Sequence, residues 1–322
     1  GLIVKGRENL LTYSNDLNNV VWNHTDVAST GGQSGYDGSN DAWLLNSSSG
    51  GNSLRRDISV SGINTFSIYA KAGTANGIRI RFDQDTDCNA YIDLTDGSVF
   101  TEGNTLSINV YPISGGWYRI SVAMNNIGLN LFRLIVTNGT TITTAGTIYI
   151  QDLQLEQGLA ASPYIESGAT NGTAGVLENT PRLNYTTGVA NPYLLLEPSR
   201  TNLIAYSEYF GSWNGFISTL TTNYGISPEG LKNATRYQAS AGTRGVIYDS
   251  IPVVNGSTYT LSVYVKSLIG NQKVRLGADA GCVNPQGAGT FDVGTEWIRV
   301  ETTITSSAIS WNVFIDNIFV KI

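Results

Sequence analysis

The residue types that perform acid–base or nucleophilic catalysis are scarce in this chain of 322 residues. His24 is its one histidine and lies in a polar segment, so any Ser-His-Asp or Cys-His arrangement would depend on it alone. Cys88 and Cys282 lie far apart in the chain and do not complete a zinc site with a single histidine. No phosphate-binding glycine loop occurs, and no pair of carboxylates is framed by a motif. We therefore predict no catalytic residues and no enzymatic activity.

Binding is the chemistry that the sequence can support. A sugar is recognised by a flat aromatic ring beside fixed polar groups, and the chain contains six Trp and 17 Tyr. The best candidates are aromatic and charged residues that differ between two repeats of the sequence, because duplicated modules diverge where they bind. The predicted ligand-binding residues are Trp43, Arg55, Arg79, Arg81, Asp83 and Asp85 in the first repeat and Arg244, Tyr248, Arg275 and Trp311 in the second. An ordinary solvated surface position is the alternative for each of them.

The charged residues among these candidates suggest the kind of ligand. Arginines and acids that share a face would suit an acidic or heavily hydroxylated glycan. By contrast, Trp117 and Trp297 are each followed two positions later by an arginine in both repeats. Because both repeats keep this pair, we assign it to packing rather than to ligand contact.

The elements that carry these residues come from a five-block repeat. The matched blocks are Asn9–Ser14 with Asn202–Ser207, Trp22-Asn23 with Trp213-Asn214, Phe66–Lys71 with Leu261–Lys266, Gly116–Ile120 with Glu296–Val300, and Tyr149–Leu155 with Phe314–Val320. Because the blocks keep one order, they indicate a duplicated domain.

The blocks alternate with period two, which is typical of strands that bury one face. Turn signals such as Asp96-Gly97 and Asn138-Gly139 separate the runs, and amphipathic helices are absent from the pattern. We predict an all-β chain of two antiparallel β-sandwich modules in tandem. The expected organisation is a lead-in over 1–8, module 1 over 9–158, a Pro- and Gly-rich connector over 159–199, and module 2 over 200–322.

Charge and hydropathy argue against two classes of partner, nucleic acids and membranes. Charged residues make up 14% of the chain, the formal net charge is −6, and the longest basic run is the pair Arg55-Arg56. Nucleic acid is a poor partner for such a chain, because phosphates require a clustered positive face. Membrane insertion is not expected either, since no apolar stretch approaches the ~20 residues of a spanning helix.

Several segments resemble known proteins. The openings NLLTYSNDLNNVVWN and RTNLIAYSEYFGSWN, together with FSIYAKAG and GWYRISV, resemble galactose-binding-like jelly-roll modules of carbohydrate-binding proteins. The run IYIQDLQLEQGLAASPYIESG, followed by PRLNYTTGVANPYLLLEPSRTNL, is similar to bacteriophage tail-fibre and head-fibre proteins, in which such modules occur in tandem. The resemblance implies jelly-roll modules, a virion-surface or extracellular location, a glycan and other virion proteins as partners, and a homotrimer.

The same resemblance raises a structural Ca²⁺ as a cofactor. Related jelly rolls hold calcium where the first strand meets the last, with backbone carbonyls and one acidic side chain. Asp152 and Asp316 stand near that place in the two modules, although the best block alignment sets Asp152 against Asn317. An aspartate that caps backbone N–H groups at a strand end is the alternative, and both interpretations stay open.

The function that these observations favour is non-catalytic glycan binding by a region of a phage fibre or similar appendage. It would recognise a host-surface or environmental polysaccharide, with weak single-site affinity raised by multivalency. Two other hypotheses remain. The modules are structural spacers or capsid decoration without a ligand, or they are ancillary carbohydrate-binding modules of a secreted polysaccharide-degrading enzyme.

Overall fold

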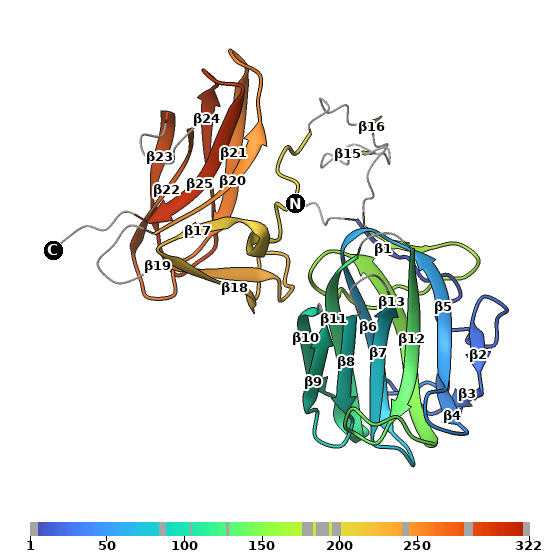
Figure 1. Ribbon diagram of the computed structural model, residues 1–322. Helices are drawn as coiled ribbons and strands as arrows, with labels where there is room; N and C mark the ends of the chain where they lie inside the picture. Colours follow the sequence, from blue (N-terminus) through green and yellow to red (C-terminus); the bar gives the residue numbers. More distant parts are fainter. Residues whose placement is uncertain are drawn as a thin grey trace. The chain divides into compact units, whose positions relative to one another are not determined.

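A computed structural model describes residues 6–83, 88–103, 105–126, 129–175, 183–184, 193–194, 201–239, 245–279 and 286–317. The chain divides into two compact units, Gly1–Leu196 and Glu197–Ile322 (Figure 1). Both are built from antiparallel strands, which confirms the predicted all-β class with two sandwich modules. The described part of the chain contains no helix that is long and apolar enough to cross a membrane.

Unit 1 is a sandwich of two six-stranded sheets. Sheet I contains, in order across the sheet, β10 (Thr105–Pro112), β11 (Trp117–Asn126), β6 (Gly62–Ala72), β13 (Gly146–Gln157), β4 (Ala42–Ser47) and β3 (Val27–Gln33). Sheet II contains β2 (Asn23–Thr25), β5 (Ser53–Ser59), β12 (Leu129–Thr137), β7 (Gly77–Asp83), β8 (Cys88–Asp93) and β9 (Val99–Gly103). Figure 1 shows the sheets as two layers, with β5, β12, β7 and β8 in front of β11, β6 and β13.

Period-two alternation places the core between these layers. On β6, Phe66 and Ile68 point inward and are fully buried, and Phe82 on β7 faces them from sheet II. The rings of Phe66, Phe82 and Phe132 form one cluster, with the Phe66 and Phe132 centroids 4.4 Å apart. The intervening side chains, such as Tyr69 on β6, therefore lie on the outer faces, where a ligand can reach them.

Unit 1 also contains short pairs outside the sandwich. They are β1 (Arg7–Asn9) with β14 (Gly172–Ala174), and β15 (Leu183–Asn184) with β16 (Tyr193–Leu194). A 3₁₀ turn, η1 (Ser114–Gly116), precedes β11. The pairing of β1 with β14 joins residues that the sequence assigned to the lead-in and to the connector.

Residues 158–167, called the strap from here on, cross the outer face of sheet I. Glu156 on β13 accepts a hydrogen bond from the Ser162 backbone N–H at 2.8 Å, and Gln154 accepts one from the Ile165 N–H at 2.7 Å. The buried Asn9 side chain ties the strap to β13, because its Nδ2 donates to the carbonyls of Leu153 at 3.1 Å and Ile165 at 2.9 Å. The strap is thus part of the sandwich.

Unit 2 repeats the topology of sheet II. Its five-stranded sheet contains β17 (Asn214–Phe216), β20 (Val246–Pro252), β25 (Ser310–Asn317), β22 (Gln272–Asp279) and β23 (Gln286–Val293). Their chain order and sheet order match β2, β5, β12, β7 and β8. Opposite this sheet, β18 (Ser218–Gly225) pairs with β19 (Ala234–Ala239), and β21 (Thr258–Val265) pairs with β24 (Ile298–Thr305); η2 spans Phe210–Ser212.

This topology corrects one block of the sequence repeat. Tyr149–Leu155 lies in β13 of sheet I, whereas the described part of Phe314–Val320 lies in β25, which takes the place of β12. Both segments alternate apolar residues near the end of a module, and that pattern alone does not distinguish the two sheets.

Candidate functional site

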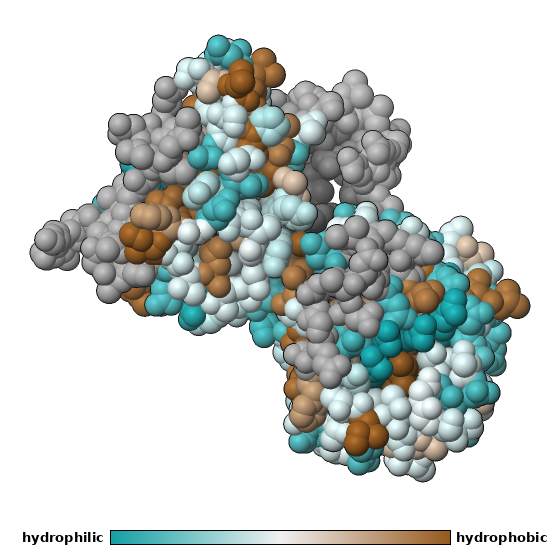
Figure 2. Space-filling model, viewed as in Figure 1, coloured by the Kyte–Doolittle hydropathy of each residue, from teal (hydrophilic) through white to brown (hydrophobic). Residues whose placement is uncertain are grey.

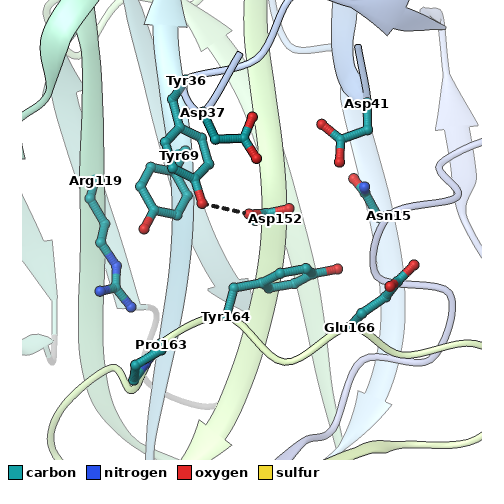
Figure 3. A pocket seen from close by; sticks show the side chains of 10 residues that line it. All are labelled: Asn15, Tyr36, Asp37, Asp41, Tyr69, Arg119, Asp152, Pro163, Tyr164 and Glu166. Atoms are coloured by element: carbon teal, nitrogen blue, oxygen red, sulfur yellow. Dashed lines mark hydrogen bonds between the residues drawn. The ribbon is translucent and has the colours of Figure 1, made fainter. Parts of the chain in front are cut away.

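A groove of about 480 Å³ opens on the outer face of sheet I, between the strap and the loop before β4 (Figure 3). We call it the sheet-I groove. Its lining residues are Asn15, Tyr36, Asp37, Asp41, Tyr69, Arg119, Asp152, Pro163, Tyr164 and Glu166. It therefore combines three tyrosine rings with four carboxylates and one guanidinium group.

The floor of the groove is shaped by an irregularity in β13. The register between β13 and β6 shifts between Gln151 and Gln154, and Asp152 within this shift has a φ of 55°, in the left-handed region. Bulges of this kind re-aim a side chain, and a non-glycine residue with positive φ is an uncommon feature that is frequent at functional sites. Here the bulge points the Asp152 carboxylate into the groove (Figure 3).

The neighbouring residue Gln151 holds the first wall in place. Its fully buried amide accepts a hydrogen bond from the Tyr36 backbone N–H at 3.1 Å and donates to Asp41 Oδ1 at 2.6 Å. It also lies 3.3 Å from Asp37 Oδ1, and Ser39 donates to the carboxylates of both aspartates. A single glutamine on the strand thus positions three groove residues from the loop.

An aromatic stack forms one side of the groove. The rings of Tyr36 and Tyr69 are parallel, with centroids 3.6 Å apart, and Trp117 meets Tyr36 edge-on at 6.4 Å. The Arg119 guanidinium lies 5.6 Å from the Tyr69 ring centre. The Tyr36 hydroxyl donates to Asp152 Oδ2 at 2.9 Å, which joins the stack to the floor (Figure 3).

The strap supplies the opposite wall. Pro163, Tyr164 and Glu166 face the groove from this side (Figure 3). The Tyr164 hydroxyl is 2.7 Å from Ser14 Oγ, and Arg119 donates to the backbone carbonyl of Ser162. The wall is therefore anchored to sheet I and to the opening segment of the unit.

The electrostatics of the groove are governed by burial and by the crowding of carboxylates. Burial, together with the charges of Asp41, Asp37 and Glu166, raises the pKa of Asp152 to about 6, although the hydrogen bond from Tyr36 opposes this. Hydrogen bonds from Ser39 lower the pKa of Asp37. Burial raises the pKa of Tyr36, with Tyr69 and Asp152 contributing in the same direction, so its hydroxyl stays a hydrogen-bond donor.

The two aspartates predicted to bind calcium, Asp152 and Asp316, each have a protein partner in the structure. Among the described residues, no group of three or more His, Cys, Asp or Glu side chains is arranged to hold a metal ion. Asp152 faces the groove and accepts from Tyr36, and the buried Asp316 pairs with Arg275 at 2.5 Å. Because β25 takes the place of β12, Asp316 is not the counterpart of Asp152. A structural Ca²⁺ stays a prediction.

Several predicted ligand residues of unit 1 meet on a different surface, the outer face of sheet II. Arg55 pairs with Asp57 at 3.0 Å, Arg81 pairs with Asp83, and Arg79 donates to the Asn89 amide oxygen at 2.7 Å. Asp85 lies outside the described residues. Trp43 lies elsewhere, half-buried against the core, and donates from Nε1 to the Asn15 carbonyl at 3.2 Å; a ligand role for its ring stays a prediction.

Three of the four predicted residues of unit 2 lie in the described part of the chain. Trp311 is buried in the core, where its ring meets Tyr259 edge-on at 5.7 Å. Arg275 stacks on Phe314 at 5.6 Å in addition to its pair with Asp316. Tyr248 is a half-buried residue of β20, and Arg244 lies outside the described residues.

Sequence reasoning named Asp152 as a metal ligand and missed the other groove residues. Arg119 belongs to a repeated Trp-x-Arg pair and was assigned to packing for that reason, whereas Tyr69, in the repeated block Phe66–Lys71, was not singled out. Tyr36 and Tyr164 lie in polar, turn-rich segments that read as loop and connector. The useful signal was the density of tyrosines and acids around 36–41 and 164–166, which loops that only connect strands do not require.

Comparisons with known proteins give only weak similarities. No family model and no curated protein matches the chain. A structure of the N-terminal CBM22-1–GH10 modules of Clostridium thermocellum endo-1,4-β-D-xylanase 10B, complexed with xylohexaose, is 14% identical with a TM-score of 0.30; the match covers 48% of this chain and 29% of that one. Bacillus subtilis oxalate decarboxylase is 9% identical with a TM-score of 0.14, over 98% of this chain and 78% of that one. The vicilin of Solanum melongena is 10% identical with a TM-score of 0.13, over 92% and 80%.

None of these similarities carries an argument, because all the TM-scores are low. The structure itself shows an all-β fold of antiparallel sheets packed as sandwiches.

Proposed function

We propose that unit 1 binds a neutral, hydroxyl-rich carbohydrate in the sheet-I groove and does so without catalysis. The observation that carries the proposal is the hydrogen bond that joins the stacked tyrosine rings to the carboxylate at the floor of the groove. Tyr36 lies on Tyr69 at 3.6 Å and its hydroxyl reaches the Asp152 carboxylate at 2.9 Å. Rings provide the apolar surface that packs on the C–H face of a pyranose, and carboxylates accept hydrogen bonds from its hydroxyls.

The charge of the groove narrows the ligand class. Asp37, Asp41, Asp152 and Glu166 line it, against the single cation of Arg119. An acidic sugar would meet repulsion from these carboxylates, whereas hydroxyl groups find charged acceptors. The volume of about 480 Å³ lies within the range of small-ligand sites and suits one or two sugar rings.

A binding experiment with matched variants tests this proposal. The full chain is screened on an array of neutral and acidic glycans, and the best ligand is titrated by calorimetry. Tyr36→Phe removes the hydroxyl that donates to Asp152 and holds this carboxylate in place. We expect the less ordered acceptor to weaken binding by about tenfold, because a preorganised group binds more tightly. Tyr264→Phe is the control, because Tyr264 matches Tyr69 in the repeat but is 46% exposed on β21.

Two results would overturn the proposal. One is the absence of binding to any neutral glycan. The other is binding that Tyr36→Phe leaves unchanged, since the ligand would then lie elsewhere. Release of product from the bound glycan would contradict the non-catalytic part.

The biological setting is a separate proposal that rests on the sequence resemblance alone. We propose that the chain is part of a phage fibre or a similar appendage, where a homotrimer would multiply weak single-site affinity. Light scattering on the full chain measures its molar mass. A monomer at all concentrations would argue against trimerisation through these units.

A further inference from the structure

One strand of sheet I has no counterpart in the described part of unit 2. In unit 1, β13 lies inside sheet I, where it pairs with β6 on one side and with β4 on the other. In unit 2, β21 pairs with β24 and β19 pairs with β18, and no described strand joins the two pairs. We call the place between β21 and β19 the unit-2 slot.

The two pairs of unit 2 match the strands that flank β13 in unit 1. On β21 and β24, Tyr264 lies opposite Arg299. Their repeat counterparts on β6 and β11, Tyr69 and Arg119, lie opposite each other in the same register. The hairpin of β18 and β19 comes between β17 and β20 in the chain, as the hairpin of β3 and β4 comes between β2 and β5. The unit-2 slot therefore corresponds to the position of β13.

Side-chain contacts place both pairs in one layer. Trp297, directly before β24, donates from Nε1 to the carbonyl of Ile226 in the loop between β18 and β19, at 3.1 Å. In unit 1 the counterpart Trp117 meets Tyr36, which lies in the loop between β3 and β4, at 6.4 Å. Side chains of β18, β19 and β21 also pack against the same buried cluster. The strands β21 and β19 thus border the slot from its two sides.

The core of unit 2 is less covered beside the slot than the core of unit 1 is beside β13. The inward side chains of β13 are fully buried; they are Ile148, Ile150, Leu153 and Leu155. On the neighbouring β6, Ile68 is fully buried too, whereas its counterpart Val263 on β21 is only partly buried. Figure 2 shows hydrophobic side chains along the strand labelled β21 in Figure 1. Apolar surface that β13 covers in unit 1 is therefore accessible in unit 2.

We propose that the unit-2 slot binds an extended segment of another protein, which joins the two pairs as an added strand. The edge of a sheet presents N–H and C=O groups to such a strand. Main-chain hydrogen bonds then provide affinity, and alternate side chains provide specificity. The segment must alternate apolar and polar residues as β13 does, and it must run antiparallel to both β21 and β19.

A separate partner fits the slot better than a second copy of this chain does. The slot corresponds to a single strand, and β21 of another copy would bring its ladder partner β24 with it. The strand β13 of another copy is held by ladders to β6 and β4, so donating it would open the sandwich of unit 1. An extended segment of a different protein meets neither obstacle.

The test uses the full chain and a labelled synthetic peptide with the sequence of β13, Gly146–Gln157, flanked by lysines for solubility. Fluorescence anisotropy measures its binding. Ile150→Asp in the peptide places a charge on the apolar face and should weaken binding by at least about tenfold. Tyr149→Asp in the peptide is the matched control, because Tyr149 alternates to the outer face, and it should change the affinity by less than about threefold.

Hydrogen exchange followed by mass spectrometry locates the bound peptide. Before the peptide is added, amides of β21 should exchange faster than those of β6, which has a ladder on each side. The peptide should slow exchange in β21 and β19 and leave exchange in β6 unchanged. Tyr36→Phe in the sheet-I groove should not alter peptide binding, so this proposal and the carbohydrate proposal can fail independently.

Several outcomes would overturn the proposal. They are the absence of peptide binding, an equal loss with Ile150→Asp and Tyr149→Asp, and protection confined to unit 1. Equal exchange of β21 and β6 before the peptide is added would show that the slot is already filled. Dimerisation of the chain that protects β21 without the peptide would assign the slot to a second copy.

Discussion

The carboxylate at the floor of the sheet-I groove offers the sharpest physical test of the site. Asp152→Asn keeps the size of the side chain and its ability to accept from the Tyr36 hydroxyl, and it removes the charge. Burial raises the pKa of Asp152 from 3.8 to about 6, so ionisation of this group opposes folding. We therefore expect the variant to be more stable than the parent protein at neutral pH.

The sign follows from proton binding. Between pH about 4 and 6 the folded protein holds more protons at this site than the unfolded chain, so stability falls as pH rises through this window and is constant above it. The asparagine variant lacks this loss. A difference of roughly two units between the folded and unfolded pKa of Asp152 corresponds to about 3 kcal/mol in the free energy of unfolding. Because the groove is open to solvent, which screens the charge, we expect about 1–2 kcal/mol.

Differential scanning calorimetry of the full chain at pH 4 and pH 7.5 measures this effect. A gain of that size raises the midpoint of the unit 1 transition by roughly 3–6 °C at pH 7.5 and by little at pH 4. Asp37→Asn is a control of opposite sign, because hydrogen bonds lower the pKa of Asp37 and its charge is favourable in the fold. It should be slightly less stable at pH 7.5. Destabilisation by Asp152→Asn at pH 7.5, or a shift independent of pH, would refute the reasoning.

Two further predictions concern stability. Ile68→Ala should lower the free energy of unfolding by about 3 kcal/mol, since Ile68 is fully buried. Val263→Ala at the matching place in unit 2 should lower it by about 1 kcal/mol, because Val263 is only partly buried. Thermal melts compare the two variants, and equal costs would contradict the difference in packing. Arg275→Met removes the guanidinium that pairs with the buried Asp316 and should cost about 3–5 kcal/mol, while Arg55→Met at an exposed pair should stay within about 1 kcal/mol. Urea titrations measure both costs.

The alternation of side chains was sufficient to predict the strands and their inward-facing residues. Phe66 and Ile68 lie in the core, and Tyr69 lies outside, as period two requires. The same rule brought Arg79 and Arg81 to one surface. It does not specify which sheet a strand joins, and for this reason β25 was matched to β13 instead of β12.

The groove was harder to predict because long-range contacts create it. Its walls come from the strap and the loop before β4, which meet only when the sandwich has closed. Gln151 and Asp152 sit in a bulge that breaks the period-two pattern, so the strand signal gives no hint of their direction. Trp43 lies outside the repeat and is half-buried against the core, so its predicted ligand contact stays a prediction.

The comparison of Tyr69 with Tyr264 explains why a residue that is repeated in the sequence can have different surroundings in the two units. Both occupy the same place in the repeat, yet Tyr69 lies beneath Tyr36 and beside the bulge of β13, whereas Tyr264 is 46% exposed on β21. In unit 1, β13 joins β6 to β4, and in the described part of unit 2 the pairs β21–β24 and β18–β19 form separate sheets. A residue shared by both units thus lines a groove only where neighbouring segments enclose it. Divergence between repeats therefore carries no information on which segments cross a sheet and enclose a groove.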